Sequence, residues 1–328
     1  MKKDSAEVSC MKRLIIPILL IITFVCMLCF PSFVFTGARN GLLLWFQIVV
    51  PTLLPFIVLS NLLMNTSTMH YITAISAPVL QRIFKVSIPG CFAIVTGFLC
   101  GYPMGAKVIS DLLKRQEISV IEGQYLLSFC NNASPMFLIS FVLIQQFHKT
   151  FLILPAVFLS LLAPILCSFL FRQLHHETVA HIIKIKKRAS QKKSVVTFFH
   201  LLDDSMMNAF EVIVKIGGYI ILFSILITLL SEESILPNRI LQQPMYQMML
   251  PFLEITNGIT LISHSSLQIE FQYIFALSLV SFGGWCSIAQ TMSMLEHTPL
   301  KINIYIIEKL ITMLVTSLLA SLYLHIIG

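Results

Sequence analysis

Long, continuous apolar runs recur along this chain, and short charged segments separate them. The runs at 14–35, 150–171 and 302–327 carry few charges, and each has the length of about 20 residues that a helix needs to cross a bilayer. Only 11% of all residues are charged and 57% are hydrophobic, whereas soluble domains have about 25% charged residues. The runs do not alternate in polarity as the strands of a β-barrel do. We therefore predict an all-α polytopic membrane protein with about six full spans.

Lysine and arginine gather in the segments between the runs, where they indicate the cytoplasmic side of a membrane. The segment 172–200 is the richest in these residues. The formal net charge of +7 is therefore attributed to orientation in the membrane, and no nucleic-acid partner is expected. Both termini are predicted to be cytoplasmic. The predicted units are an uncleaved first span (1–40), a first half (41–171), a basic cytoplasmic loop (172–205) and a second half (206–328).

Three apolar stretches contain residues that interrupt a helix. The sequence GFLCGYPMGAKVISD at 97–111 combines several glycines with a proline, and SFGGWCSIAQTMSML at 281–295 contains a glycine pair. A third interruption, FCNNASP, lies at 129–135. Interrupted backbone at membrane depth is tolerated only where it is buried in protein or lines a water-filled cavity. We therefore predict broken or re-entrant helical hairpins at 89–113 and 269–296 that help to form a solute site.

The second half repeats the plan of the first half. Segment 44–63 aligns with 208–227, and GFLCGYPMGA aligns with SFGGWCSIAQ. PVLQRIF (78–84) aligns more weakly with PFLEITN (251–257). The charge pattern places the start of the first copy outside and the start of the second copy inside, so the repeat is predicted to be inverted. An inverted repeat with paired interruptions points to a secondary-transporter site between the two copies.

The predicted site collects the interrupted backbone and the polar residues that stand near it. Half-helix ends within the membrane present backbone N–H groups and the positive end of a dipole, which suits a carboxylate or phosphate. Tyr102 and Trp285 follow two of the interruptions and could stack on a flat ring. The expected substrate-binding residues are Gly101, Tyr102, Pro103, Lys107, Asn131, Asn132, Ser134, Glu254, Asn257, Gly283, Gly284 and Gln290.

Several of these residues have a second interpretation. The glycine clusters could serve only close helix packing. Lys107 could bind an anionic solute or pair with Asp111 one turn away. Glu254 could carry a coupling proton, bind a cation or cap a short helix. Glu308 and Lys309 are assigned to the start of the last span, with an orienting or snorkelling role.

No catalytic or cofactor motif is recognised in the sequence. It contains no GxSxG, HExxH, Walker or GxGxxG pattern, and the histidines of the basic loop have no cysteine or carboxylate cluster beside them. We therefore expect no enzyme activity, no metal site and no cofactor, apart from a coupling ion such as H⁺ or Na⁺.

The motifs GYPMGAKVISDLL and EGQYLLSFCNNASPMFL, with LLPFIVLSNLL upstream and LEITNGI and SFGGWCSIAQ downstream, resemble a known family. The chain is similar to sporulation integral membrane proteins of the YlbJ type, over residues 40–325. This resemblance implies a nucleoside-recognition or gate domain, a role in endospore formation, and a location in the cell membrane or outer forespore membrane. It also implies movement of dipicolinic acid, a pyridine ring with two carboxylates.

The leading functional prediction is a secondary transporter or facilitator for a small anionic solute, dipicolinate first. One alternative is transport of nucleosides or nucleobases, and another is a non-transporting scaffold that recruits spore-assembly proteins through the 172–200 loop. The expected partners are the solute, membrane lipid and further copies of the chain in a homo-oligomer.

Overall fold

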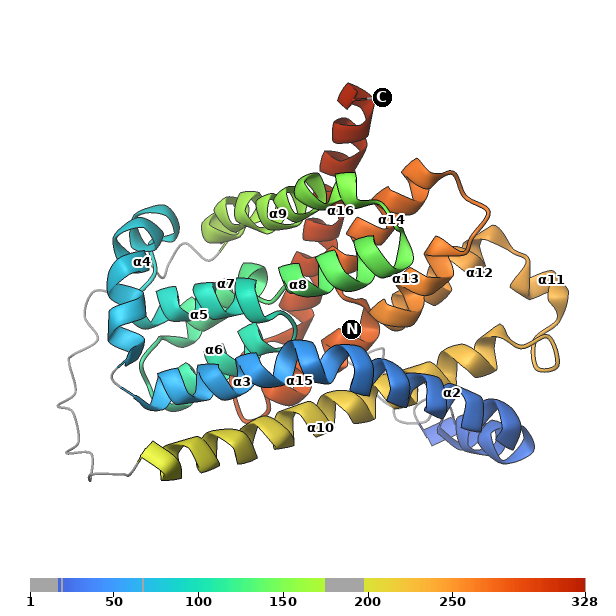
Figure 1. The fold of residues 1–328 in the computed structure, drawn as a ribbon, viewed down its shortest axis with the longest axis horizontal. Coiled ribbons are helices and arrows are strands. Elements are labelled where there is room, and N and C mark those ends of the chain that lie inside the picture. The colour runs from blue at the N-terminus through green and yellow to red at the C-terminus, as the bar shows by residue number, and fades with distance from the viewer. Residues whose placement is uncertain (1–16, 19, 67, 175–197, 328) are drawn as a thin grey trace, which may run out of the picture.

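The computed structural model describes residues 17–18, 20–66, 68–174 and 198–327. Within these ranges every regular element is a helix, which confirms the all-α prediction (Figure 1). Six of the described helices are long and apolar enough to cross a membrane, or seven if one bent pair counts as a span. The basic N-terminal residues and positions 175–197 of the basic loop lie outside the described residues, so the prediction for that loop stays a prediction.

The first long helical stretch does not follow the bounds of the apolar run at 14–35. A short apolar helix, Leu20–Cys29, is followed by one continuous helical stretch that comprises α2 (Pro31–Leu44), η1 (Trp45–Val49) and α3 (Val50–Asn65). The first predicted run, 14–35, therefore does not end at residue 35, because α2 continues through Leu44. Pro31 starts the helix, as proline does well in a first turn. Gly37 lies inside α2, where its missing side chain lets α2 approach a neighbouring helix closely.

The first predicted hairpin is present. Helix α4 (Thr68–Phe84) precedes α5 (Ile88–Cys100), and the two meet at a bend of 95°. Residues 101–103 then interrupt the chain, and α6 (Met104–Lys114) packs back against α5. Neither α5 nor α6 is long enough to cross a bilayer alone.

The third interruption is also present. Helix α7 (Val120–Cys130) ends before residues 131–134, and the span continues as α8 (Pro135–Phe137) and the π-helix η2 (Leu138–Gln146). The short η3 (Thr150–Leu152) leads into α9 (Ile153–Leu174), which closes the first half.

The second half has the same order of elements. It consists of α10 (Phe198–Ser231), α11 (Asn238–Leu241), α12 (Pro244–Met249), η6 (Leu250–Phe252), α13 (Ile255–Ser263), α14 (Ile269–Phe282), α15 (Gly284–Met294) and α16 (Ile302–Ile327). Helices α14 and α15 are interrupted at Gly283, which has a left-handed conformation with φ of 90°, yet together they form one span, Ile269–Met294. The predicted second hairpin is thus a broken span that does not fold back.

The two glycine-containing interruptions that the sequence alignment pairs differ in the structure. After residues 101–103, α6 packs back against α5, whereas α14 and α15 form one span across Gly283. In the order of elements, α5 and α6 stand at the place of α12 and α13, and the broken span α7–α8–η2 stands at the place of α14–α15.

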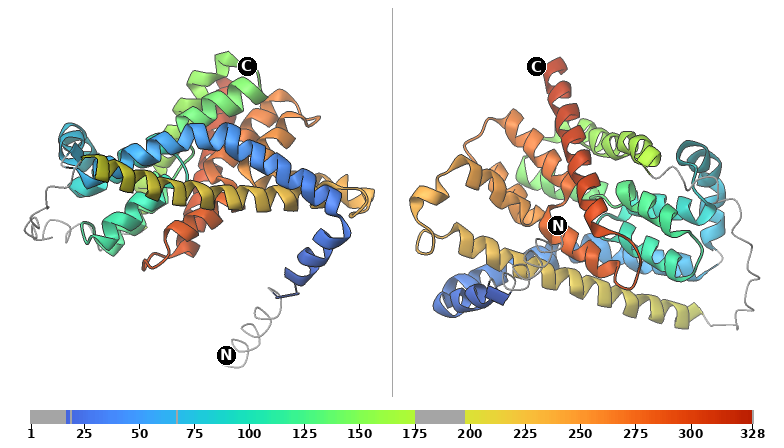
Figure 2. Two further views of the ribbon diagram at one scale, coloured as in Figure 1. Left: turned by 60° about the horizontal axis from the view of Figure 1, so that its bottom comes forward. Right: turned by 180° about the vertical axis from the view of Figure 1, so that it is seen from behind.

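The first helical stretch and α10 lie side by side and run in opposite directions (Figures 1 and 2). A Cβ atom on Gly41 would lie 2.8 Å from the Cα of Ile221, and the Trp45 side chain donates a hydrogen bond of 2.9 Å to the Ile213 carbonyl. Each stretch is 34 residues long, Pro31–Met64 and Phe198–Ser231. Corresponding elements that run antiparallel are what an inverted repeat requires.

The interruptions lie at the border between two buried apolar clusters. Along α7 and η2 the first cluster reaches Cys130 and the second begins at Leu138, while along α14 the second reaches Val280 and the first resumes at Phe282. Large apolar side chains such as Phe35, Leu154 and Leu318 are exposed on the outside of the bundle, as expected for a surface that faces lipid.

Candidate functional site

The interrupted segments of the two halves meet. Gly101, with φ of 85°, packs so closely on the interruption at 131–134 that a Cβ atom there would lie 2.7 Å from the Ser134 nitrogen. The Tyr102 hydroxyl donates to the Ser281 carbonyl at 2.8 Å, and its ring covers Gly283. The Cys286 N–H binds the Leu253 carbonyl at 2.9 Å. All four interruptions therefore form one buried junction.

A small cavity of about 70 Å³ lies at this junction. Five predicted site residues line it, together with Thr52, Thr256, Cys286, Ser287 and apolar side chains of η1, α3 and α10; the five are Gly101, Tyr102, Ser134, Glu254 and Gln290. We call this space the junction cavity. Cavities of about 150 Å³ are needed to hold benzene in other proteins, so the junction cavity is closed to a six-membered ring in this conformation.

Glu254 is buried, with 1% of its surface exposed, and it caps α13. Its carboxylate accepts hydrogen bonds from the backbone N–H of Thr256 at 3.0 Å and of Asn257 at 2.9 Å. The side chains of the same two residues donate to it at 2.5 and 2.8 Å. The Asn257 amide also donates to Ser224 of α10 at 2.8 Å. The capping role, one of the three that the sequence left open, is therefore present.

Asn131 is fully buried and joins three helices. Its amide nitrogen donates to Thr291 at 2.9 Å and to the hydroxyl of Tyr305 at 2.8 Å, while its oxygen accepts from the Ala106 N–H at 3.3 Å. Asn132 donates to the Phe129 carbonyl at 2.6 Å. Asn131 therefore acts as a clamp between α6, α15 and α16, with its hydrogen-bonding groups occupied by protein.

Three of the half-helix N-termini receive a side-chain acceptor. Asn131 accepts from the first turn of α6, Ser134 accepts from Phe137 in α8, and Glu254 caps α13. Helix α15 begins after Gly283 without a side-chain cap, and the N–H of Cys286 in its first turn binds the Leu253 carbonyl. Buried backbone donors are costly to leave unpaired, and nearby polar side chains satisfy them.

The position of Lys309 differs from the one predicted from the sequence. It is fully buried in α16, and its amino group donates to the Asn131 carbonyl at 3.1 Å and to the Asn132 side-chain oxygen at 3.0 Å. The same amino group lies 5.0 Å from the centre of the Tyr102 ring. Among the described residues no carboxylate pairs with it. Lys309 therefore belongs to the junction, and a snorkelling role at the membrane surface is wrong.

A sequence signal for Lys309 did exist. It lies about 10 Å along α16 from Ile302, and apolar residues flank the Glu308–Lys309 pair. A charge at that depth is costly unless it has partners or a function. Its partners come from α7 and the segment after it, nearly 180 positions earlier, so only the tertiary structure shows them.

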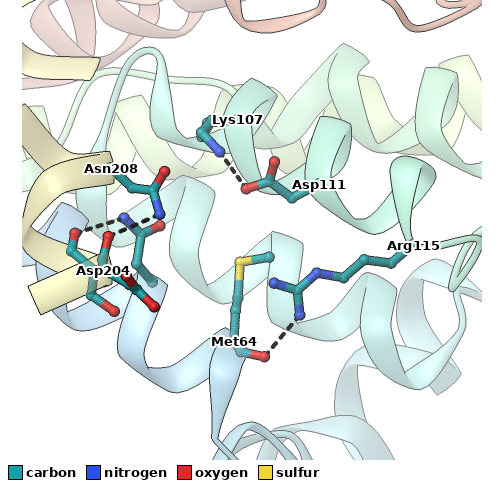
Figure 3. A network of polar contacts seen from close by, with 8 residues as sticks. Met64, Lys107, Asp111, Arg115, Asp204 and Asn208 are labelled. Carbon is teal, nitrogen blue, oxygen red and sulfur yellow. Dashed lines mark hydrogen bonds and ion pairs between the residues drawn. The ribbon is translucent and has the colours of Figure 1, made fainter. Parts of the chain in front are cut away.

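Lys107 lies away from the junction cavity. It pairs with Asp111 at 2.5 Å and lines a different cavity at the far end of α6 (Figure 3). Trp285 is 47% exposed and packs edge-on against Phe282, so it does not stack over the junction cavity. Pro103, Gly283 and Gly284 shape the junction through their backbone. Among the described residues no cluster of histidine, cysteine and acidic side chains could hold a metal ion.

Comparison with curated proteins finds a relative that extends over most of the chain. The sequence is 26% identical over 309 residues to the sporulation integral membrane protein YlbJ of Bacillus subtilis (strain 168), which covers 86% of this chain and 75% of the relative. The chain is therefore similar to that protein over most of its length. No family model matches the sequence, and no solved structure matches it. Together with the six long apolar helices, this similarity indicates an integral membrane protein.

Proposed function

We propose that this chain is a secondary transporter or facilitator that moves a small dicarboxylate, dipicolinate, across the outer forespore membrane during endospore formation. The observation that carries the proposal is the junction itself. Four interrupted segments from two similar halves meet around buried polar groups, which is the arrangement in which transporters of several folds bind their solutes. Helix packing alone does not require a buried lysine and a buried glutamate at the same junction.

Lys309 is the proposed partner of one solute carboxylate. Its amino group is held by two oxygens of the interruption at 131–134 and faces the Tyr102 ring. Tyr102 also lines the junction cavity, so its ring stands between that cavity and Lys309. For a carboxylate to reach Lys309, the Tyr102 ring has to move. The aromatic face of Tyr102 then becomes available to the pyridine ring.

Glu254 is the proposed site of the coupling ion, H⁺ or Na⁺. Its carboxylate lines the junction cavity and would repel a dianion there unless a cation or proton neutralised it. Because the cavity is too small for the ring, the solute-bound state must be more open. In an inverted repeat such opening arises when one half rocks against the other.

The test is uptake of labelled dipicolinate into vesicles that contain the purified full chain, with and without H⁺ and Na⁺ gradients. Lys309→Met retains the length of the side chain and removes the amino group. We expect its KM to rise about 10- to 100-fold, the range for loss of one hydrogen bond to a charged group. Lys301→Met is the matched control, because Lys301 is exposed and its side chain has no described partner.

Unchanged uptake in Lys309→Met would remove Lys309 from the site. Absence of uptake by the folded native chain under every gradient would overturn transport of dipicolinate. Inhibition of uptake by nucleosides, and not by dicarboxylates, would instead assign the junction to nucleosides.

A further inference from the structure

A second, more polar cavity lies at the far end of α6. It is lined by Asn61 and Met64 from α3, by Asn208 from α10, and by four residues of α6 and its C-terminal cap, namely Lys107, Asp111, Lys114 and Arg115 (Figure 3). We call it the α6 vestibule. Its volume of about 230 Å³ exceeds the roughly 150 Å³ that holds a benzene ring in other proteins.

The charges of the α6 vestibule are unbalanced. Three basic side chains and one carboxylate line it. Lys107 is paired with Asp111, and Arg115 donates to the Met64 carbonyl at 3.0 Å, which fixes its guanidinium against α3. Lys114 is exposed, and no described carboxylate pairs with it. Lys114 therefore contributes a positive charge to the vestibule that no described carboxylate neutralises.

The neutral groups of the vestibule are already committed to protein. Asn61 donates to the Ser205 carbonyl at 3.3 Å, and Asn208 donates to the Asp204 carbonyl at 2.9 Å. The Asp204 carboxylate lies 3.3 Å from His200 on the exposed side of α10. The bond from Asn61 to Ser205 joins α3 and α10 beside the opening, and the other two contacts lie within α10.

The sequence of α6 places these charges on one face. Positions 107, 111, 114 and 115 follow the spacing of i, i+4, i+7 and i+8, whereas Gly105, Ala106, Ile109 and Leu112 are buried on the other side. The helix is about 16 Å long. Its polar face runs from Lys107, about one turn after the interruption at 101–103, to the outer end of the vestibule.

We propose that the α6 vestibule is a second anion-binding site, which takes a carboxylate or phosphate group before the anion moves along α6 to the junction. The incoming anion binds Lys114 first and then competes with Asp111 for Lys107. A positively lined cleft with apolar walls raises the local concentration of anions. The identity of the anion as dipicolinate rests on the proposed function, but its charge follows from the vestibule alone.

The experiment measures thiol labelling in the vestibule, which needs no transport. The full chain carries Asn208→Cys, at an exposed position on the rim, together with Cys29→Ser to remove an exposed native thiol. In phosphatidylcholine vesicles, dipicolinate or inorganic phosphate is expected to slow labelling of Cys at this position. Adding Lys114→Gln should weaken the protection about two- to fivefold, as expected for one partly exposed charge. Lys149→Gln makes the same change in net charge at an exposed position outside the vestibule and should leave the protection unchanged.

Vesicles that contain phosphatidylglycerol distinguish the two sources of the anion. Protection by this lipid without added solute, lost in Lys114→Gln, assigns the site to a lipid headgroup, whereas protection only by dipicolinate or phosphate assigns it to a free anion. Absence of protection in every arm, or protection that Lys114→Gln and Lys149→Gln alter equally, overturns the proposal. Protection without uptake would overturn dipicolinate transport and leave the anion site in place.

Discussion

Two lysines show how residue identity and residue environment differ. Lys107 stands in a glycine-rich motif, yet it is partly exposed and paired with Asp111. Lys309 stands in an ordinary apolar run, yet it is fully buried among Asn131, Asn132 and Tyr102. Both carry the same chemistry, and only the three-dimensional neighbours assign one to the vestibule and the other to the junction.

At the residue scale, Asn131→Leu is expected to destabilise the junction. The change removes three hydrogen bonds between α6, α15 and α16 and leaves the Ala106 N–H without its acceptor. A buried group left unpaired costs about 1–3 kcal/mol, so the thermal denaturation midpoint in detergent should fall clearly. Asn40→Leu is the control, since Asn40 is exposed on α2. An unchanged midpoint for Asn131→Leu would contradict its role as a clamp.

At the element scale, glycine has two separate uses in this chain. Gly101 and Gly283 have positive φ angles and interrupt helices, whereas Gly97 and Gly41 lie inside helices and permit close packing. From the sequence, each glycine cluster is predicted either to interrupt a helix or to permit close helix packing. In the structure the GFLCGYPMGA motif contains both uses, because Gly97 packs on α7 and Gly101 ends α5.

The packing use predicts a contrast between two alanine substitutions. A Cβ atom on Gly97 would lie 2.2 Å from the Cys130 carbonyl oxygen, so Gly97→Ala must push α5 away from α7. Overpacking of this kind costs about 1–3 kcal/mol. Gly218 of α10 has nothing within 4 Å of its Cβ position, and alanine there favours the helix by up to about 1 kcal/mol. Thermal denaturation of both variants should show a lower midpoint only for Gly97→Ala, and equal midpoints would argue against the close α5–α7 contact.

At the scale of the whole molecule, two halves with the same order of elements surround one junction. The contacts of Trp45 with Ile213 and of Asn61 with Ser205 show that α10 runs antiparallel to the stretch from α2 to α3. This arrangement supports the proposed inverted repeat and the proposed rocking of the halves. It also separates the α6 vestibule from the far end of α10 by about 34 Å, roughly the thickness of a bilayer.

The topology follows from this separation. Lys114→Cys at the vestibule and Glu233→Cys beyond α10 are both exposed and should be labelled from opposite sides of the membrane by an impermeant thiol reagent. We expect Lys114 on the cytoplasmic side, with the basic residues. Cys29→Ser in both variants removes the thiol that is exposed among the described cysteines. Labelling of both positions from one side would contradict the predicted topology.

The sequence by itself determined the class of the protein and the places where its helices are interrupted. An apolar run that is long enough to cross a bilayer has few stable alternatives to a spanning helix. Glycine and proline interrupt a helix where they occur in a cluster. The tertiary structure alone decided that 36–40 is helical, that α14 and α15 form one span, and that α6 packs back against α5 after the 101–103 interruption. It also decided that Lys309, and not Lys107, lies at the junction. Each of these outcomes depends on contacts between residues far apart in the chain, and local propensity carries no information about such contacts.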